Sequence, residues 1–207
     1  NDFRMTFTLP LALAYTDVID ETDATRLFFS PSFGLLWRAT DSWTFTGGGS
    51  YGMNQTGWNR LITTCIMSNY RTLNRYVPDL SDSYSASVNV KITYKDILNE
   101  FFAYAQGNAS RSWSDVAYGT DIDENAHTVM SVRRMPNHSD WYSLMGNISK
   151  GFDWHKARLE TTADYHRSEN RILRQSVATD SHSDTYSIYG HAAADIIQPL
   201  RIDYDYN

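Results

Sequence analysis

The chain has 207 residues, of which 42% are hydrophobic, 20% charged and 14% aromatic. Average charge with so many aromatic residues excludes a disordered chain, and the lack of a glycine period or sustained heptad excludes collagen and a coiled coil. No run of 18 apolar residues occurs, which excludes a transmembrane helix. A transmembrane β-strand is not excluded, because it presents only every second residue to lipid.

The formal net charge is -6, and no block of basic residues occurs, so we expect no nucleic-acid partner. Cys65 is the only cysteine, so the chain forms no internal disulfide. No basic and apolar leader precedes the patterned sequence, and we expect any targeting segment to have been removed or to lie upstream. A two-residue alternation still runs through 200–207, so we expect a fragment of a larger protein.

The first strongly patterned segment runs from Phe3 to Tyr15. Its odd positions are Phe, Met, Leu or Tyr, whereas its even positions include Arg4, Thr6 and Thr8. This alternation predicts a β-strand more than twice as long as the average soluble strand of about 5–6 residues. It is close to the roughly 9–11 residues that cross a bilayer at a tilt.

Similar alternation recurs along the chain and predicts about nine strands in total. After the first segment, the expected strands cover 27–39, 43–53, 84–94, 100–115, 127–152 with a break at Pro136, 159–165, 186–196 and 200–206. The alternation is weakest in the 100–115 and 127–152 strands. In the other segments the apolar positions include no charged residue, although a fifth of the chain is charged. Such exclusion is expected where a face meets lipid, because Arg or Lys there costs roughly 2–4 kcal/mol.

Tyr and Trp recur near the ends of the apolar faces, with aliphatic residues and Gly between them. Examples are Trp43 and Tyr51 in one strand, and Tyr84 and Tyr94 in the next. This distribution is typical of the two interfacial girdles of a membrane barrel. We therefore predict an all-β fold, an antiparallel up-and-down transmembrane β-barrel of which the chain supplies about nine strands. The alternative is a soluble all-β ligand-binding module whose core is the same apolar face.

Connection lengths favour the barrel, because long and short links are expected to alternate. The expected long links are 17–25, 54–82, a loop after Asp115 that includes Gly119, and a polar loop over 168–183; the short ones are 40–41, 95–99, 153–156 and 198–199. Outer-membrane barrels have short turns on the periplasmic side and long loops outside.

Three constellations were considered as chemical sites. His166, Glu169 and His182 form one metal-ligand candidate, but His166 and Glu169 are expected on opposite faces of a strand. A calcium candidate consists of Asp121, Asp123 and Glu124, which lack the EF-hand spacing. Asp164, His166 and Ser168 share one strand face about 7 Å apart, too far for a catalytic triad. We therefore predict no catalytic residues, no metal and no cofactor, and the chain is not expected to be an enzyme.

Aromatic and arginine side chains gather in the long 54–82 link. They are Trp58, Arg60, Tyr70, Arg71, Arg75 and Tyr76. They are candidate contacts for a ligand or partner, and packing of the loop on itself is the alternative. Gly47, Gly48 and Gly49 are expected within a strand, where glycine permits curvature or close backbone approach, because no helix start or Lys-Ser/Thr pair follows to make a phosphate site.

Three segments resemble the barrel of Bacteroidetes TonB-dependent outer-membrane receptors. They are Gly146–Trp154 with Lys156, the loop segment Ile66–Tyr76, and Tyr94–Phe102, which is similar to that family's strand-turn-strand signature. The resemblance implies a 22-stranded barrel in the cell outer membrane and energised uptake of a scarce nutrient, such as a siderophore, a vitamin complex or a glycan.

It also implies partners: outer-membrane lipid, a plug domain, an energy-coupling protein and a possible surface lipoprotein. Residues 1–207 would then be a partial barrel domain, without plug or signal peptide. With two open edges, such a segment is expected to aggregate when isolated in water.

Overall fold

The computed structural model describes residues 2–16, 24–55, 66–69, 72–74, 82–122, 128–175, 177–197 and 200–206. These residues are almost entirely β-strand, with one 3-10 turn at Trp154–Lys156. The strands are β1 (Asp2–Thr8), β2 (Leu11–Thr16), β3 (Ala24–Phe29), β4 (Ser32–Arg38), β5 (Trp43–Gln55), β6 (Ile66–Asn69), β7 (Thr72–Asn74), β8 (Asp82–Asp96), β9 (Phe101–Ile122), β10 (Thr128–Phe152), β11 (Ala157–Arg174), β12 (Val177–Ile197) and β13 (Leu200–Tyr206).

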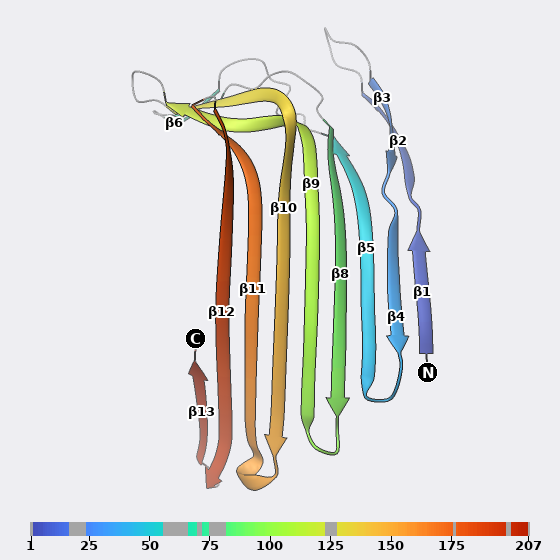
Figure 1. The fold of residues 1–207 in the computed structure, drawn as a ribbon, viewed down its shortest axis with the longest axis vertical. Helices are drawn as coiled ribbons and strands as arrows, with labels where there is room; N and C mark the ends of the chain where they lie inside the picture. Colours follow the sequence, from blue (N-terminus) through green and yellow to red (C-terminus); the bar gives the residue numbers. More distant parts are fainter. Residues whose placement is uncertain are drawn as a thin grey trace.

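The long strands lie side by side in chain order (Figure 1). The path through the main sheet is β1-β4-β5-β8-β9-β10-β11-β12-β13, and each neighbouring pair on it is antiparallel. β2 and β3 continue β1 and β4 upward as a separate two-stranded ladder. The prediction of about nine antiparallel strands is confirmed. In the described part of the chain the sheet is open, with β1 and β13 at opposite edges.

Prolines divide the first two expected strands without ending them. Pro10 separates β1 from β2, and Pro31 separates β3 from β4, because proline has no N–H to give to the ladder. Their carbonyls still take part: Ser30 N donates to Pro10 O at 3.3 Å, and Tyr51 N donates to Pro31 O at 2.9 Å. The register therefore continues across both interruptions.

The predicted loop after Asp115 is wrong, because β9 continues to Ile122. Its upper part pairs with the start of β10, and there it also forms a short parallel pairing with β11 at Gly119–Leu173 and Thr120–Arg174. The register shift in β10 lies between Arg134 and Asn137, around the predicted break at Pro136. Above this shift the strands of the β9–β10 hairpin exchange places relative to β11. There β9, instead of β10, lies beside β11. Backbone pairing with β10 on one side and with β11 on the other makes this segment a strand.

The buried apolar side chains of the described residues, Val116, Ala117 and Leu173, lie at this crossing. A Cβ on Gly119 would lie 2.2 Å from the Cβ of Leu173, so only glycine permits this approach. The long sheet below the crossing has no comparable buried apolar cluster within the described ranges. Within the described residues the long part of the sheet is thus a single layer, with no second layer on either face.

The predicted polar loop over 168–183 is also wrong. β11 and β12 stay in register from Arg158–Ala193 up to Arg174–Val177, so only a tight turn joins them. The cross-strand pairs of this hairpin include Arg171 and Asp180, and Leu173 near its tip is buried. Opposite charges across a strand pair stabilise a hairpin even where apolar residues do not alternate along it.

The alternation of loop lengths therefore holds only in part. At the lower end of Figure 1 the β4–β5, β8–β9 and β10–β11 links are all short turns, as expected. At the upper end, only the β2–β3 and β5–β8 links are long. At the β9–β10 and β11–β12 connections, long strands instead of long loops form the upper end of the molecule.

Candidate functional site

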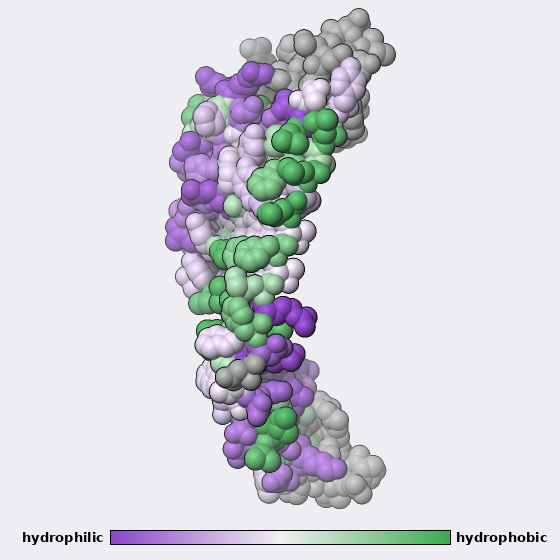
Figure 2. Space-filling view, turned by 90° about the vertical axis from the view of Figure 1, so that its right-hand side faces the viewer, coloured by the Kyte–Doolittle hydropathy of each residue, from purple (hydrophilic) through white to green (hydrophobic). Residues whose placement is uncertain are grey.

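The register brings the predicted apolar positions of all the strands to one side of the sheet, named here the apolar face. One hydrogen-bonded row across it reads Met5, Leu35, Gly47, Val90, Gly107, Leu144, Tyr165 and Tyr186. Its large side chains are open to the surroundings: 72% of Leu13, 51% of Val90 and 56% of Ile148 are exposed. Figure 2, viewed onto the β1 edge, shows hydrophobic residues gathered along the middle of the molecule.

Two lines of aromatic side chains border the apolar face. In the lower line the rings of Trp37 and Phe45 lie 5.1 Å apart, and those of Trp43 and Tyr94 lie 4.8 Å apart. In the upper line the rings of Tyr165 and Tyr186 are separated by 4.8 Å. The lower line passes through Trp37, Trp43, Tyr94, Phe101 and Phe152, and the upper one through Tyr51, Tyr142, Tyr165 and Tyr186, with Tyr84 and Trp113 just above it.

Both lines cross the strands obliquely. On each strand we compared the aromatic residue of the lower line with the residue that pairs with the previous aromatic residue. The aromatic residue lies two residues lower from β4 to β5, level from β5 to β8, two lower from β8 to β9 and two lower from β9 to β10. A drop of six residues is about 20 Å along the strands over about 19 Å across them, an inclination of roughly 45°. The upper line drops by four residues over five steps from Tyr51 to Tyr186, an inclination of roughly 30°.

Charge is almost excluded between the two lines. In the described part of the apolar face, the one charged side chain between them is Lys150, at the lower border. Its Nζ donates to the carbonyl of Asn99 in the β8–β9 turn, so its charge points away from the band. A long lysine stem that lies along apolar surface with its head at the border is the usual solution for such a position.

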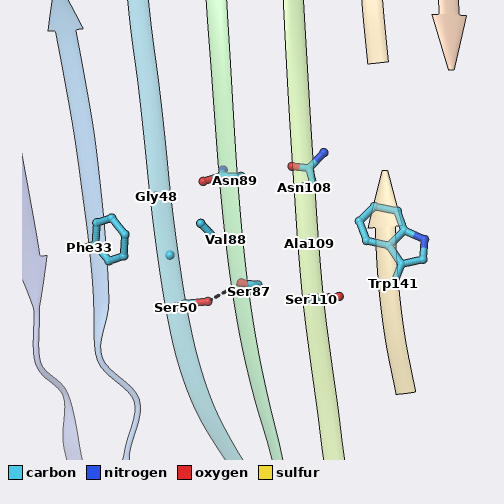
Figure 3. A pocket seen from close by; sticks show the side chains of 11 residues that line it. Phe33, Gly48, Ser50, Ser87, Val88, Asn89, Asn108, Ala109, Ser110 and Trp141 are labelled. Carbon is cyan, nitrogen blue, oxygen red and sulfur yellow. Dashed lines mark hydrogen bonds between the residues drawn. The ribbon is translucent and has the colours of Figure 1, made fainter. Parts of the chain in front are cut away.

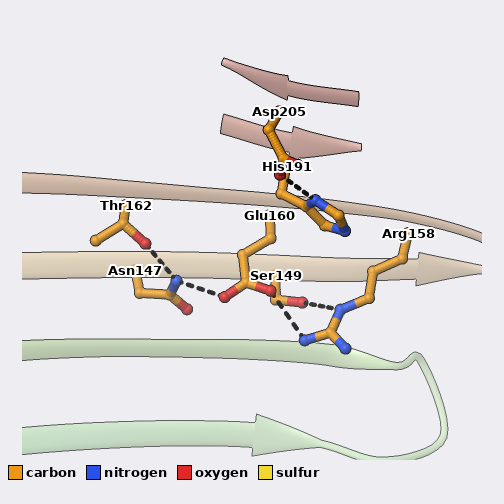
Figure 4. Close-up of polar contacts among 7 residues, drawn as sticks. All are labelled: Asn147, Ser149, Arg158, Glu160, Thr162, His191 and Asp205. Carbon is orange, nitrogen blue, oxygen red and sulfur yellow. Dashed lines mark hydrogen bonds and ion pairs between the residues drawn. The ribbon is translucent and has the colours of Figure 1, made fainter. Parts of the chain in front are cut away.

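The opposite side of the sheet, the polar face, is charged in its lower half. Arg158 donates to Ser149 Oγ at 3.2 Å and to Glu160 Oε2 at 3.0 Å, and Asn147 donates to Glu160 Oε1 at 3.0 Å (Figure 4). On the neighbouring strands His191 and Asp205 form a contact of 2.6 Å. These contacts join β10 to β11 and β12 to β13.

The upper half of the polar face has a different chemistry. Three of its register rows contain no Asp, Glu, Lys or Arg, and we name this surface the serine face. The rows are Thr6, Gly34, Gly48, Asn89, Asn108, Ser143, His166 and Thr185; then Thr8, Ser32, Ser50, Ser87, Ser110, Trp141, Ser168 and Ser183; then Gly52, Ser85, Ser112, Ser139, Asn170 and Ser181.

A hollow of about 510 Å³ opens on the serine face, lined by β4, β5, β8, β9 and β10 (Figure 3). Trp141 borders it with 41% of its surface exposed, and its ring stacks on that of His166 at 6.0 Å. Gly48 shapes the hollow, because a Cβ there would lie 2.9 Å from Asn89 Oδ1. Ser50 and Ser87 bond to each other at 2.9 Å. Among the described residues Asn89 and Ser110 have no side-chain partner, so both are available to a ligand.

Ion pairs begin above the upper aromatic line, on the same side as the apolar face. Arg111 binds Asp140 through two contacts of 2.6 Å, and Arg171 binds Asp180 at 2.7 Å. The hydrogen bond from Arg111 lowers the pKa of the buried Asp140 below its usual value, and Arg171 does the same for Asp180. Charge on this side of the sheet thus resumes where the aromatic border ends.

The loop candidates Trp58, Arg60, Tyr70, Arg71 and Tyr76, with Arg75, lie outside the described residues, as do Asp123 and Glu124. Among the residues that are described, no three His, Cys, Asp or Glu side chains gather at one point. Glu169 is registered with His182, whereas His166 is registered with Thr185 on the other side of the sheet. Asp164, His166 and Ser168 share the polar face, and no hydrogen bond joins them in the described contacts.

Sequence reasoning missed the serine face, although serine, asparagine and glutamine at alternate positions of 83–89 and 106–114 signalled it. It also missed the Arg111–Asp140 pair, whose partners are distant in sequence.

No family model matches the chain, and neither a curated protein nor a solved structure matches it. Among the described residues, helices long and apolar enough to traverse a membrane are absent.

Proposed function

We propose that this chain is part of the wall of an outer-membrane β-barrel, with its apolar face against acyl chains. The observation that carries the proposal is the oblique, nearly uncharged band between two aromatic lines. Its inclination of roughly 30–45° agrees with the tilt of about 35–45° in transmembrane barrels. On β8, the eleven residues from Tyr84 to Tyr94 span about 33 Å along the strand, or about 25 Å of membrane thickness at that tilt.

The area of the band supports the same proposal. The seven strands from β4 to β12 that the two lines cross, spaced by about 4.8 Å over about 33 Å, make an apolar surface of roughly 1,100 Å². The largest apolar patch on a typical soluble monomer is about 300–600 Å². No second layer covers this face in the ranges that the structure describes. A bilayer supplies the missing cover, and antiparallel neighbours satisfy the backbone groups within it.

The narrower proposal is a TonB-dependent receptor for energised uptake of a scarce nutrient. It rests on the resemblance of the segments Tyr94–Phe102 and Gly146–Trp154, which here form the short β8–β9 and β10–β11 connections with their flanking strands. In this arrangement the polar face lines the barrel interior, the short turns face the periplasm, and the extended strand ends face outward. A plug domain, an energy-coupling protein and a surface lipoprotein are the partners that such a receptor uses.

Reconstitution tests the membrane proposal. We expect the protein to require detergent and to enter vesicles of outer-membrane phospholipid, with gel migration that changes on heating. A monodisperse monomer in plain buffer with a cooperative melt would contradict the proposal and support the soluble binding module. Uptake that persists in cells lacking the energy-coupling protein would contradict the receptor assignment alone.

A further inference from the structure

We infer that a groove on the apolar face holds one phospholipid molecule with a phosphoethanolamine headgroup. Its acyl chain lies in the groove, its phosphate binds Lys150 and its ammonium binds Asp96. The inference rests on the proposed function and deepens it, since it separates one retained lipid from the fluid lipid around the barrel. The shape of the groove and two opposite charges at its lower end carry it.

The groove has a volume of about 490 Å³, which is within the usual size of a ligand pocket. Its floor consists of small residues from β9, β10 and β11: Ala103, Ala105, Gly146 and Ala163. A Cβ on Gly146 would meet nothing within 4 Å, so the space over the floor is open. Val90 and Leu144 stand in the next row above, each more than half exposed. An acyl chain in the groove therefore contacts side chains beneath and beside it, whereas on a flat face it contacts them on one side only.

The lower end of the groove lies at the lower aromatic line, because Trp43 and Tyr94 belong to both. In the next row down on this face, Asp96, Phe101 and Lys150 follow one another across β8, β9 and β10. With strands spaced by about 4.8 Å, the backbones of the two charged residues stand roughly 10 Å apart. They flank the groove at the level of the aromatic border, where a bilayer places its headgroups.

The two charges select the headgroup. Lys150 donates to the carbonyl of Asn99, and an ammonium has three donors, so this bond leaves others for a phosphate. Asp96 accepts two hydrogen bonds from Asn99, and a carboxylate has about four acceptor sites. A primary ammonium can donate to the remaining sites. A headgroup with a trimethylated ammonium has no N–H to donate, and a purely anionic one would place like charge beside Asp96.

Native mass spectrometry of the full chain in detergent micelles tests the inference. The probes are phosphatidylethanolamine, phosphatidylcholine and phosphatidylglycerol with identical acyl chains. We expect one phosphatidylethanolamine molecule to be retained per protein, with saturation, and the other two lipids to be retained more weakly.

Two variants remove the two parts of the site. Ala105→Leu fills the groove and Lys150→Gln removes the charge that holds the phosphate, and we expect each to weaken retention about tenfold. The matched controls are Ala192→Leu, which adds the same volume to the apolar face outside the groove, and Lys91→Gln, on the polar face. Both controls are expected to leave retention unchanged.

Three results would overturn the inference: no retained lipid, tighter retention of either other lipid, or equal losses in a variant and its control. A protein dimer that Ala105→Leu dissociates would place a second copy of the chain in the groove and would overturn it too. Entry into vesicles is measured on the same preparations, and if Ala105→Leu fails to insert, Lys150→Gln decides. Insertion without selective lipid retention refutes this inference alone, and selective retention without insertion refutes the membrane proposal alone.

Discussion

Replacing Val90 by Arg tests which solvent meets the apolar face. Val90 lies on β8 between the aromatic residues Tyr84 and Tyr94, near the middle of the band. An Arg at the midplane of a membrane barrel costs about 2–4 kcal/mol, which is roughly 30- to 700-fold in the folding equilibrium. The matched control is Asn89→Arg, on the polar face one residue away, where we expect a change within about 0.5 kcal/mol. Folding into phospholipid vesicles at graded urea concentrations measures both.

A second substitution at the same position separates lipid from a packed core, because either environment rejects a charge. Val90→Phe adds volume without polarity. Fluid acyl chains accommodate the ring, so we expect a change within about 0.5 kcal/mol, whereas overpacking a protein core costs about 1–3 kcal/mol. Equal costs for Val90→Arg and Asn89→Arg would refute the face assignment. A large cost for Val90→Phe would refute the lipid contact.

Two further predictions concern the upper end of the sheet. Gly119→Ala places a Cβ against Leu173 and is expected to lower the free energy of unfolding in urea by about 1–3 kcal/mol. The control is Gly146→Ala, whose Cβ would meet nothing within 4 Å and which is expected to be neutral or stabilising. Equal effects of the two substitutions would contradict the close approach of β9 to β11. Asp140→Asn is expected to cost about 1–3 kcal/mol at pH 7. Because Arg111 lowers the pKa of Asp140, the stabilisation is present at neutral pH and is lost as the pH falls below about 4, so wild type and variant should converge there. A gap independent of pH would show that the ion pair is not its source.

The sequence contained the information for the strands and their faces, because both are local. Alternation with a period of two assigns Phe7 and Val88 to one side and Thr8 and Asn89 to the other without reference to any partner. It failed at the upper end of the sheet, where apolar and polar residues no longer alternate. The 168–183 hairpin is stabilised by pairs such as Arg171–Asp180, and those pairs exist only once the register is known. The segment after Asp115 failed similarly, since its partners in β10 and β11 are distant in sequence.

The candidate site was beyond prediction from sequence for the same reason. Ser50, Ser87, Ser110 and Ser168 belong to four strands, and only the register aligns them in one row beside Trp141. The oblique course of the aromatic lines is likewise a relation between strands. A sequence shows where each tyrosine sits on its own strand, but the inclination requires the offset between neighbours.

That inclination also bears on the rival binding module. In a soluble sandwich, apolar residues cover whatever area the second sheet covers, and the sheets are limited by strands of about 5–6 residues. Here β8 to β12 have 15 to 25 residues each, and the apolar band occupies only part of each strand, with borders that descend in the same direction from the β1 edge toward β12. An apolar band that crosses tilted strands obliquely is what a planar slab of hydrocarbon imposes, because the slab ignores the direction of the chain. A covering sheet would instead follow the strands.

Arginine placed inside the band and arginine placed below it should therefore have different effects. Thr161→Arg on β11, inside the band, is expected to impair vesicle insertion. Ser42→Arg in the β4–β5 turn, below the band, is expected to leave insertion unchanged. Equal effects of these two substitutions would remove the slab from the explanation.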